Sequence, residues 1–140
     1  MKILILCTGN SCRSQMAEGF LKSFDSRLEV YSAGTKPADK PNQFAIKAMA
    51  EIGIDISNQK PENVQKYLLE SFDYLITVCD NAKETCPVFL GKVKNRLHLD
   101  FEDPADAVGT EEEVMPVYRL VRDKIRNNFH KFYLEKIKGE

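Results

Sequence analysis

A cysteine and an arginine near the start of the chain, Cys7 and Arg13, are separated by five residues. A cysteine thiolate is a strong nucleophile, and an arginine guanidinium can hold two oxygens of one tetrahedral anion. Gly9 and Asn10, which lie between them, favour the tight turns in which several backbone N–H groups point at one anion. The spacing therefore predicts a loop that binds an oxyanion and attacks it. The alternative is a buried cysteine at the end of a strand, followed by a solvated arginine.

The segments on either side are those that such a loop needs. Residues 2–6 are apolar after Lys2, as expected for a strand that is buried on both faces. Residues 14–24 carry apolar side chains at helical spacing. A helix N-terminus and free loop N–H groups stabilise a thiolate, and the hydroxyl of Ser14 can donate to the sulfur of Cys7. We expect the oxyanion to be bound by the loop residues Thr8, Gly9, Asn10, Ser11, Cys12, Arg13 and Ser14.

Strands and helices alternate along the rest of the chain. Further strands are predicted at residues 28–32, 74–78 and 96–99. Helices are predicted at residues 42–52, in a segment that begins at Pro61 and buries Val64 and Leu68, and from about Thr110 to the C-terminus. This order predicts an α/β fold in which a parallel sheet carries helices on both faces. The chain has 140 residues, 43% of them hydrophobic, and no internal linker. Residues 1–140 are therefore expected to form one domain with a sizeable core.

Two features of the sequence disagree about where the C-terminal helix begins. Thr110 and Glu113 are spaced as a capping box, which predicts a helix from Glu111. Pro116 would then lie inside the helix, so we expect a kink there or a start near Met115. The predicted apolar stripe consists of Val117, Leu120, Val121, Ile125, Phe129 and Phe132. The charged side chains expected on a solvated face are those of Arg119, Arg122, Asp123, Lys124, Arg126 and Lys131.

Two more reactive side chains follow predicted strands. Cys79 ends one strand, and Asp103 lies shortly after another. Because ligands bind at the carboxyl ends of the strands in parallel sheets, we expect Cys7, Cys79 and Asp103 at one edge. Pro104 restrains Asp103, which makes its carboxyl a candidate general acid for a leaving oxygen. The spacing does not separate it from three nearby carboxylates, those of Asp100, Glu102 and Asp106.

Composition excludes several classes of function. A net charge of −1 without a basic block gives no support for nucleic-acid binding. No apolar run approaches the ~20 residues of a membrane span, and the N-terminal run is too short for a signal peptide. We therefore expect a cytoplasmic protein that does not associate with membranes. In a reducing cytoplasm the four cysteines predict catalytic or redox roles, and their spacing does not match zinc-ligand pairs.

Residues 7–19, Cys-Thr-Gly-Asn-Ser-Cys-Arg-Ser-Gln-Met-Ala-Glu-Gly, resemble the thioredoxin-coupled arsenate reductases of the low-molecular-weight protein tyrosine phosphatase superfamily. Residues 30–34, 54–58, 103–105 and 119–125 also match, so the resemblance covers essentially the whole chain. It implies a four-stranded parallel sheet flanked by helices, no bound cofactor, and thioredoxin as the partner that supplies electrons. It also implies that Asp103 is the general acid and that arsenate, phosphate or sulfate can occupy the loop. We expect a monomer.

The resemblance assigns a thiol relay to Cys79 and Cys86. In that family the first cysteine, here Cys7, attacks arsenic, and the second, here Cys79, attacks the first and releases arsenite. The third, here Cys86, then forms a disulfide with Cys79 that thioredoxin reduces. If residues 80–85 were helical, the two cysteines would lie ~10.5 Å apart along the axis, whereas a disulfide needs Cα atoms within about 7 Å. We therefore expect this segment to unwind or loop out on oxidation.

Some assignments stay open. Three of the four residues that bind potassium in some members of the family are matched by Asn10, Glu18 and Ser32. The fourth position is Glu62, and this departure leaves a potassium requirement open. Cys12 is expected to be a spare thiol rather than a reversible partner of Cys7 under oxidation. We expect His98 and His130 to be structural or solvated.

The same loop suits two other functions. A low-molecular-weight protein tyrosine phosphatase would use Cys7 to hydrolyse phosphomonoesters through a phosphocysteine intermediate. Arsenate and phosphate have nearly the same shape and charge, so weak phosphatase activity is expected in either case. Phosphatases of the family usually place an aromatic residue after Asp-Pro, whereas Ala105 follows here, which favours a bare inorganic oxyanion. An oxyanion-binding or redox-sensing module without catalysis would leave Asp103 and a relay cysteine idle.

Overall fold

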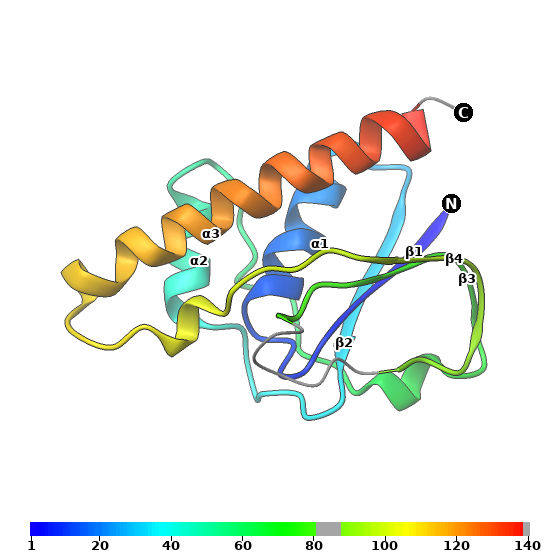
Figure 1. Ribbon diagram of the computed structural model, residues 1–140, viewed down its shortest axis with the longest axis horizontal. Coiled ribbons are helices and arrows are strands. Elements are labelled where there is room, and N and C mark those ends of the chain that lie inside the picture. Colours follow the sequence, from blue (N-terminus) through cyan, green and yellow to red (C-terminus); the bar gives the residue numbers. More distant parts are fainter. Residues whose placement is uncertain (81–87, 139–140) are drawn as a thin grey trace.

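The computed structural model describes residues 1–80 and 88–138. Its centre is a parallel sheet of four strands, namely β1 (Lys2–Cys7), β2 (Glu29–Gly34), β3 (Ser71–Thr77) and β4 (Lys92–His98). The strand order is β2-β1-β3-β4, so the strand that leads into Cys7 is central. The register aligns Cys7 with Gly34 and Leu6 with Thr77, which brings the carboxyl ends of three strands to one edge (Figure 1). The parallel sheet predicted from the sequence is confirmed.

Both faces of the sheet are covered, by different means. The helices α1 (Arg13–Phe24), α2 (Gln43–Ala50) and α3 (Glu111–Phe132) share one core with alternate residues of β1, Ile3 and Ile5. On the other face Leu4 and Leu6 pack in a cluster with Phe89 and with the short 3₁₀ helix η1 (Val64–Tyr67). Within the described residues, no helix combines the length and apolar character that a membrane span requires.

The prediction of a helix from Pro61 is wrong, because the segment forms only the short 3₁₀ helix η1. The carbonyl of Glu62 accepts the N–H of Gly34, and Asn63 forms a bridge with the same glycine at the end of β2. These long-range contacts hold Asn63 in an extended conformation, and its side chain then caps a single short turn. As a result Leu68, which was expected to be buried, is 41% exposed.

Several element boundaries also differ from the predictions, among them the start of β3, which lies at Ser71 rather than at Tyr74. The strand predicted at residues 96–99 is longer, because β4 begins at Lys92, where exposed polar side chains give no apolar signal. The capping box of Thr110 and Glu113 does start α3 at Glu111, so the later start near Met115 is wrong. Pro116 lies inside the helix but close to its N-terminus and on the exposed side. Leu120 does not belong to the buried stripe, since it is 53% exposed.

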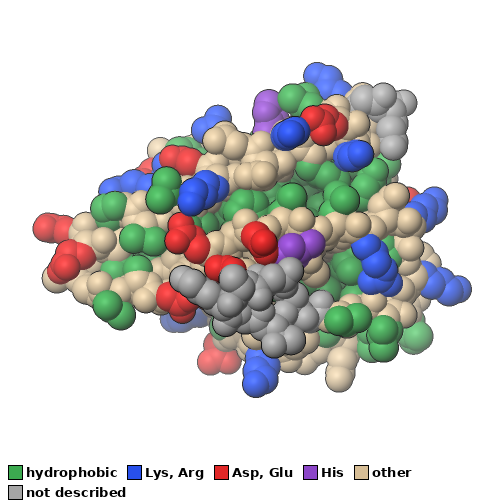
Figure 2. Space-filling view, in the orientation of Figure 1, with side chains coloured by type: hydrophobic (Ala, Val, Ile, Leu, Met, Phe, Trp, Pro, Cys, Tyr) green, Lys and Arg blue, Asp and Glu red, His purple; other side chains and the backbone are tan. Residues whose placement is uncertain are grey.

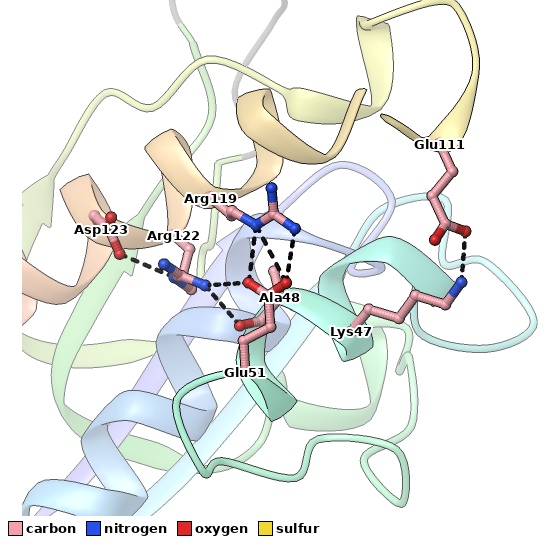
Figure 3. A network of polar contacts seen from close by, with 7 residues as sticks. All are labelled: Lys47, Ala48, Glu51, Glu111, Arg119, Arg122 and Asp123. Atoms are coloured by element: carbon pink, nitrogen blue, oxygen red, sulfur yellow. Dashed lines mark hydrogen bonds and ion pairs between the residues drawn. The ribbon is translucent and has the colours of Figure 1, made fainter. Parts of the chain in front are cut away.

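The charged face of α3 is partly used for packing, which corrects the expectation that it is solvated. Arg122 is only 8% exposed, and it donates to the carbonyl of Ala48 and to the carboxylate of Glu51, each at 2.9 Å (Figure 3). Arg119 makes a forked contact with the same carboxylate. A hydrogen bond from Arg119, and to a smaller extent one from Arg122, lowers the pKa of Glu51. These contacts join the end of α2 to the middle of α3.

Candidate active site

The segment from the end of β1 to the first turn of α1, residues 7–14, is called the loop here and surrounds the sulfur of Cys7 with hydrogen-bond donors. The backbone N–H of Asn10 points at this sulfur from 3.2 Å, and the hydroxyl of Ser14 lies 2.9 Å from it. Cys7 itself is 2% exposed. The loop precedes the N-terminus of α1, where the helix dipole also favours negative charge. These are the surroundings that a nucleophilic thiolate needs.

Asn10 holds this loop in shape. Its backbone φ is +49°, in the left-handed region that residues other than glycine rarely adopt, and this conformation accompanies the contact of its N–H with the sulfur. Its carbonyl accepts from the side chain of Gln15 at 2.9 Å, and its side-chain oxygen accepts the N–H of Glu62 at 2.8 Å. Its side-chain nitrogen donates to Ser14 at 2.7 Å. The strained residue is therefore fixed from several sides, as functional loops often require.

Arg13 and Asp103 lie at the same cavity as Cys7. Arg13 is 4% exposed, donates to the carbonyl of Phe101 at 3.1 Å, and approaches an oxygen of Asp103 at 3.6 Å. The other oxygen of Asp103 accepts the N–H of Ala105 at 3.0 Å, which caps the 3₁₀ helix η2 (Pro104–Asp106). A cavity of about 340 Å³ is lined by residues 7–13 together with Asp103 and Asp106. A nucleophile, a cation and a carboxyl group thus share one space.

The sequence did not distinguish Asp103 from three nearby carboxylates as the general acid, and the structure places these groups in different surroundings. Asp106 lines the cavity, whereas Glu102 lies 3.3 Å from the ammonium of Lys124. Asp100 contacts the ring of His98, and the other ring nitrogen of this histidine lies 2.6 Å from the hydroxyl of Thr77. Asp103 and Asp106 are therefore the carboxylates that line the cavity among these candidates.

Cys12 is a buried thiol within the same loop. It is 3% exposed, and burial raises its pKa well above the ordinary value, with the negative charge of Asp103 adding to this effect and Arg13 opposing it. A thiol that keeps its proton is a poor nucleophile. This environment favours the interpretation of Cys12 as a spare thiol.

Cys79 lies two residues beyond β3, at the sheet edge where Cys7 lies. It is fully buried and disulfide-bonded, whereas Cys7 and Cys12 are free. The N–H of Val78 donates to the carbonyl of Leu6 at 3.0 Å, so the chain leading to Cys79 runs beside the chain leading to Cys7. Cys86, the third cysteine of the predicted relay, lies outside the described residues.

The residues matched to the potassium site converge, but they bond to one another. Asn10 donates to the hydroxyl of Ser32 at 2.9 Å, and this hydroxyl donates to Glu18 at 2.6 Å. The second oxygen of Glu18 accepts from the ammonium of Lys22, and Glu62 presents its backbone N–H to the network. Hard cations bind through several oxygen ligands, and this arrangement does not fit a potassium ion. The described residues also contain no group of three or more His, Cys, Asp or Glu side chains that could hold a metal.

Two pairs of side chains that support the loop were not predicted. Gln59 donates to the side-chain oxygen of Gln15 at 2.8 Å and to its carbonyl at 2.9 Å. Asn42 donates its backbone N–H to Ser11 at 2.7 Å and its side-chain N–H to Tyr118 at 3.1 Å. Burial raises the pKa of Tyr118 to about 12. These contacts join residues far apart in the chain through common amide and hydroxyl groups, so no motif or periodicity indicates them.

The fold and this cysteine-arginine loop define a known class of protein. The sequence model of the low molecular weight phosphotyrosine protein phosphatase family matches residues 2–140, and the chain belongs to this family. A curated arsenate reductase of Oceanobacillus iheyensis is 50% identical to it over 131 residues, which are 93% of each chain.

Solved structures agree with this relative. A structure of an arsenate reductase in the phosphate binding state has a TM-score of 0.79 and 28% identity, and the match covers 96% of this chain and 97% of that one. A thioredoxin-dependent arsenate reductase of Corynebacterium glutamicum has a TM-score of 0.59 and 26% identity, with 96% of this chain and 63% of that one covered. Within the family the chain groups with arsenate reductases, and the resemblance noted in the sequence is confirmed.

Proposed function

We propose that this protein is an arsenate reductase, which converts arsenate to arsenite with Cys7 as its nucleophile. The observation that carries the proposal is the cavity lined by the sulfur of Cys7, the loop that donates hydrogen bonds to it, and Arg13. The likeness to arsenate reductases supports arsenate as the substrate among tetrahedral oxyanions. A module that only binds oxyanions would leave Asp103 without a role.

In the first step the thiolate of Cys7 attacks arsenic. The N–H groups of residues 8–14 and the guanidinium of Arg13 bind the arsenate oxygens. A sulfur–arsenic bond forms while one arsenic–oxygen bond breaks, and Asp103 protonates the leaving oxygen, which departs as water. The donors around the loop are fixed before the substrate binds, and such preorganised groups usually contribute most to catalysis of this kind.

The electrons come from thiols. The thiolate of Cys79 attacks the sulfur of Cys7, and the electron pair of the sulfur–arsenic bond stays on arsenic, which leaves as arsenite. Cys86 then attacks Cys79 and releases Cys7 as a thiolate. Arsenic gains two electrons, and two thiols lose them as they become the Cys79–Cys86 disulfide. The disulfide-bonded state of Cys79 and its place beside the end of β1 support this relay.

Thioredoxin is the electron donor in this proposal, and the protein acts as a monomer in the cytoplasm. The thioredoxin-dependent relative from Corynebacterium glutamicum supports this choice. A dithiol that becomes a disulfide supplies the two electrons that each arsenate consumes. No step is assigned to potassium, because the residues at the matched positions do not fit it.

A single-turnover assay with the fully reduced protein and arsenate tests the proposal. We expect one arsenite per protein, the loss of two thiols, and a Cys79–Cys86 disulfide in peptide maps. If two thiols are not lost when arsenite forms, the relay is wrong.

Slow hydrolysis of phosphomonoesters is the second activity that the site supports, because phosphate resembles arsenate in shape and charge and the family model is that of a phosphatase. It is measured with p-nitrophenyl phosphate. Steady hydrolysis of this ester without any arsenite release from arsenate would establish a phosphatase in place of a reductase.

A further inference from the structure

Asp106 lines the cavity that contains Cys7, and the mechanism above gives it no role. It is the last residue of η2, and Asp103, the proposed general acid, immediately precedes this helix. A 3₁₀ helix has three residues per turn, so side chains three positions apart lie on one face. Asp103 and Asp106 have this spacing and both line the cavity, whereas Pro104 is buried and Ala105 is exposed. Asp106 therefore belongs to the wall of the cavity that carries the general acid.

Backbone hydrogen bonds fix Asp106 in this wall. Its N–H donates to the carbonyl of Asp103 at 3.1 Å, and the N–H of Ala107 donates to the carbonyl of Pro104 at 3.1 Å. The carboxylate of Asp103 caps the same turn by accepting the N–H of Ala105 at 3.0 Å. The ring of Pro104 also restricts the backbone at the first position of the turn. The place of Asp106 is thus set before any substrate binds.

The negative charge of Asp106 is not offset by an ion pair. Glu102 lies 3.3 Å from the ammonium of Lys124, and Glu111 makes an ion pair with Lys47. In the part of the chain that the structure describes, Asp106 has no such partner. Figure 2 shows acidic side chains gathered above and to the left of the atoms drawn in grey, near the segment that contains η2 and is yellow in Figure 1. Asp106 therefore adds uncompensated negative charge to the cavity.

The positive charge available to a ligand in the cavity is small. Among the described residues that line it, the cation is Arg13, whose guanidinium already lies 3.6 Å from an oxygen of Asp103. A tetrahedral oxyanion occupies Arg13 and the N–H groups of the loop. A second anionic group on the same ligand finds no further cation among these residues and meets Asp106. Like charges repel, and they do so more strongly near a protein surface than in bulk water.

The leaving oxygen determines which part of a ligand lies near Asp106. In the proposed mechanism Asp103 protonates this oxygen, which therefore faces the wall formed by η2. In arsenate the leaving oxygen carries no organic group and departs as water. In a phosphomonoester the same oxygen carries the organic group, which then lies on the side of the cavity where Asp106 is fixed. The charge of that group therefore interacts with the carboxylate of Asp106.

We propose that Asp106 selects phosphomonoesters by charge, so that the site hydrolyses esters with a cationic organic group and disfavours esters with an anionic one. This inference rests on the phosphomonoester hydrolysis that is part of the proposed function. The thiolate of Cys7 attacks phosphorus, the bond from phosphorus to the ester oxygen breaks, and Asp103 protonates the departing alcohol. Water then cleaves the sulfur–phosphorus bond, which releases phosphate and restores Cys7. No electrons are transferred in either step.

The test compares Asp106→Asn with the wild type on para-substituted aryl phosphates. The organic group is anionic in 4-carboxyphenyl phosphate, neutral in 4-carbamoylphenyl phosphate and cationic in 4-(trimethylammonio)phenyl phosphate. Each kcat/KM is divided by that of the neutral ester, which removes any effect of the substitution on the phosphate group itself. In Asp106→Asn we expect this ratio to rise about fivefold for the anionic ester and to fall about fivefold for the cationic ester.

Two further variants sharpen the comparison. Asp106→Lys reverses the charge, so it is expected to prefer the anionic ester to the cationic one. Glu102→Gln is the matched control, because this exposed carboxylate precedes Asp103 in the chain but lies at Lys124 instead of lining the cavity. Its ratios are expected to match those of the wild type. Added salt is expected to reduce the discrimination shown by the wild type, since it screens exposed charges.

Equal ratios in Asp106→Asn and the wild type would overturn the proposal. Where an ester is hydrolysed too slowly to follow, its binding is measured by the protection of Cys7 against iodoacetamide, and the ratios of the protection constants are compared instead. That measurement requires neither turnover nor arsenate, and equal protection by the three esters in the wild type would also overturn the proposal. Failure of the proposed function looks different, because the wild type would then release no arsenite in a single turnover.

Discussion

The loop around Cys7 and the surface that begins at Val88 are built in opposite ways. In the loop, Asn10 and Ser14 are fully buried, and their polar atoms are bonded within the protein. Beyond residue 87 the chain instead exposes apolar side chains such as Leu90. A site that stabilises charge on a small anion works best with donors fixed in advance, whereas a site that meets a protein needs open apolar area. The loop is thus built to stabilise charge, whereas the surface that begins at Val88 exposes apolar area.

Replacing one cysteine from each part of the relay gives the sharpest test of this separation. Cys7→Ser is expected to lower arsenite formation on the order of 10³-fold or more, even in a single turnover, because the nucleophile is lost. Cys86→Ser is expected to release one arsenite per protein and then stop with a Cys7–Cys79 disulfide. Arsenite is quantified by chromatography with elemental detection. Normal turnover of Cys86→Ser with thioredoxin would rule out the three-cysteine relay.

Arg13→Lys tests the geometry of the anion site alone. Lysine keeps the charge but loses the planar fork, so kcat/KM for arsenate is expected to fall about 100-fold. Reduction of the Cys79 disulfide by thioredoxin, followed separately by thiol titration, is expected to be unchanged. The control is Arg126→Lys, on the exposed face of α3. Equal losses in both half-reactions would mean that the two regions are not independent.

Ser14→Ala removes one of the two donors that contact the sulfur of Cys7. A hydrogen bond to a charged group contributes about 1.5–3 kcal/mol, so alkylation of Cys7 by iodoacetamide at pH 7 is expected to slow by at least roughly tenfold. Peptide mapping assigns the modified cysteine. Ser23→Ala is the matched control, because that hydroxyl lies on the same helix and bonds to the carbonyl of Phe20. Equal alkylation rates would mean that the N–H of Asn10 suffices.

The sequence predicted the loop because its signals are local. Cys7, Arg13, the apolar strand before them and the helix after them are contiguous, so motif and periodicity report on one structure. The helix at Pro61 failed for the opposite reason, since the contact of Glu62 with Gly34 overrides the local preference. Such a hydrogen bond between distant segments leaves no trace in either segment alone.

The side chains that support the loop could not be predicted from the sequence for a related reason. Gln59 contacts Gln15, which lies 44 positions away in the chain, and Tyr118 contacts Asn42, which lies 76 positions away. Any amide or hydroxyl could serve in such places. The exposure of Leu68 was equally hidden, because this residue lies in a pattern that indicates a buried helix face. Residue types predicted which groups react, and only the fold places the groups that hold them.

The thiol of Cys12 provides a test of how completely the folded loop excludes water. Burial raises its pKa in the folded protein well above the ordinary value of 9.0, so the folded state keeps a proton that the unfolded chain releases above about pH 9. Stability from this group is therefore complete below that pH and declines as the pH rises, by at most about 1.4 kcal/mol per unit. Urea unfolding at pH 8 and pH 10 under reducing conditions measures the decline.

Cys12→Ala is the matched variant, and the slopes with pH are compared rather than the stabilities, since the lost sulfur also leaves a cavity. The variant is expected to lose less stability between the two pH values than the wild type. Part of the decline is expected to persist, because the pKa of Tyr118, raised to about 12 by burial, acts in the same direction. Identical slopes would mean that Cys12 ionises freely in the folded protein. Water would then reach the loop as it reaches the surface around Leu90, and the contrast between the two regions would fail.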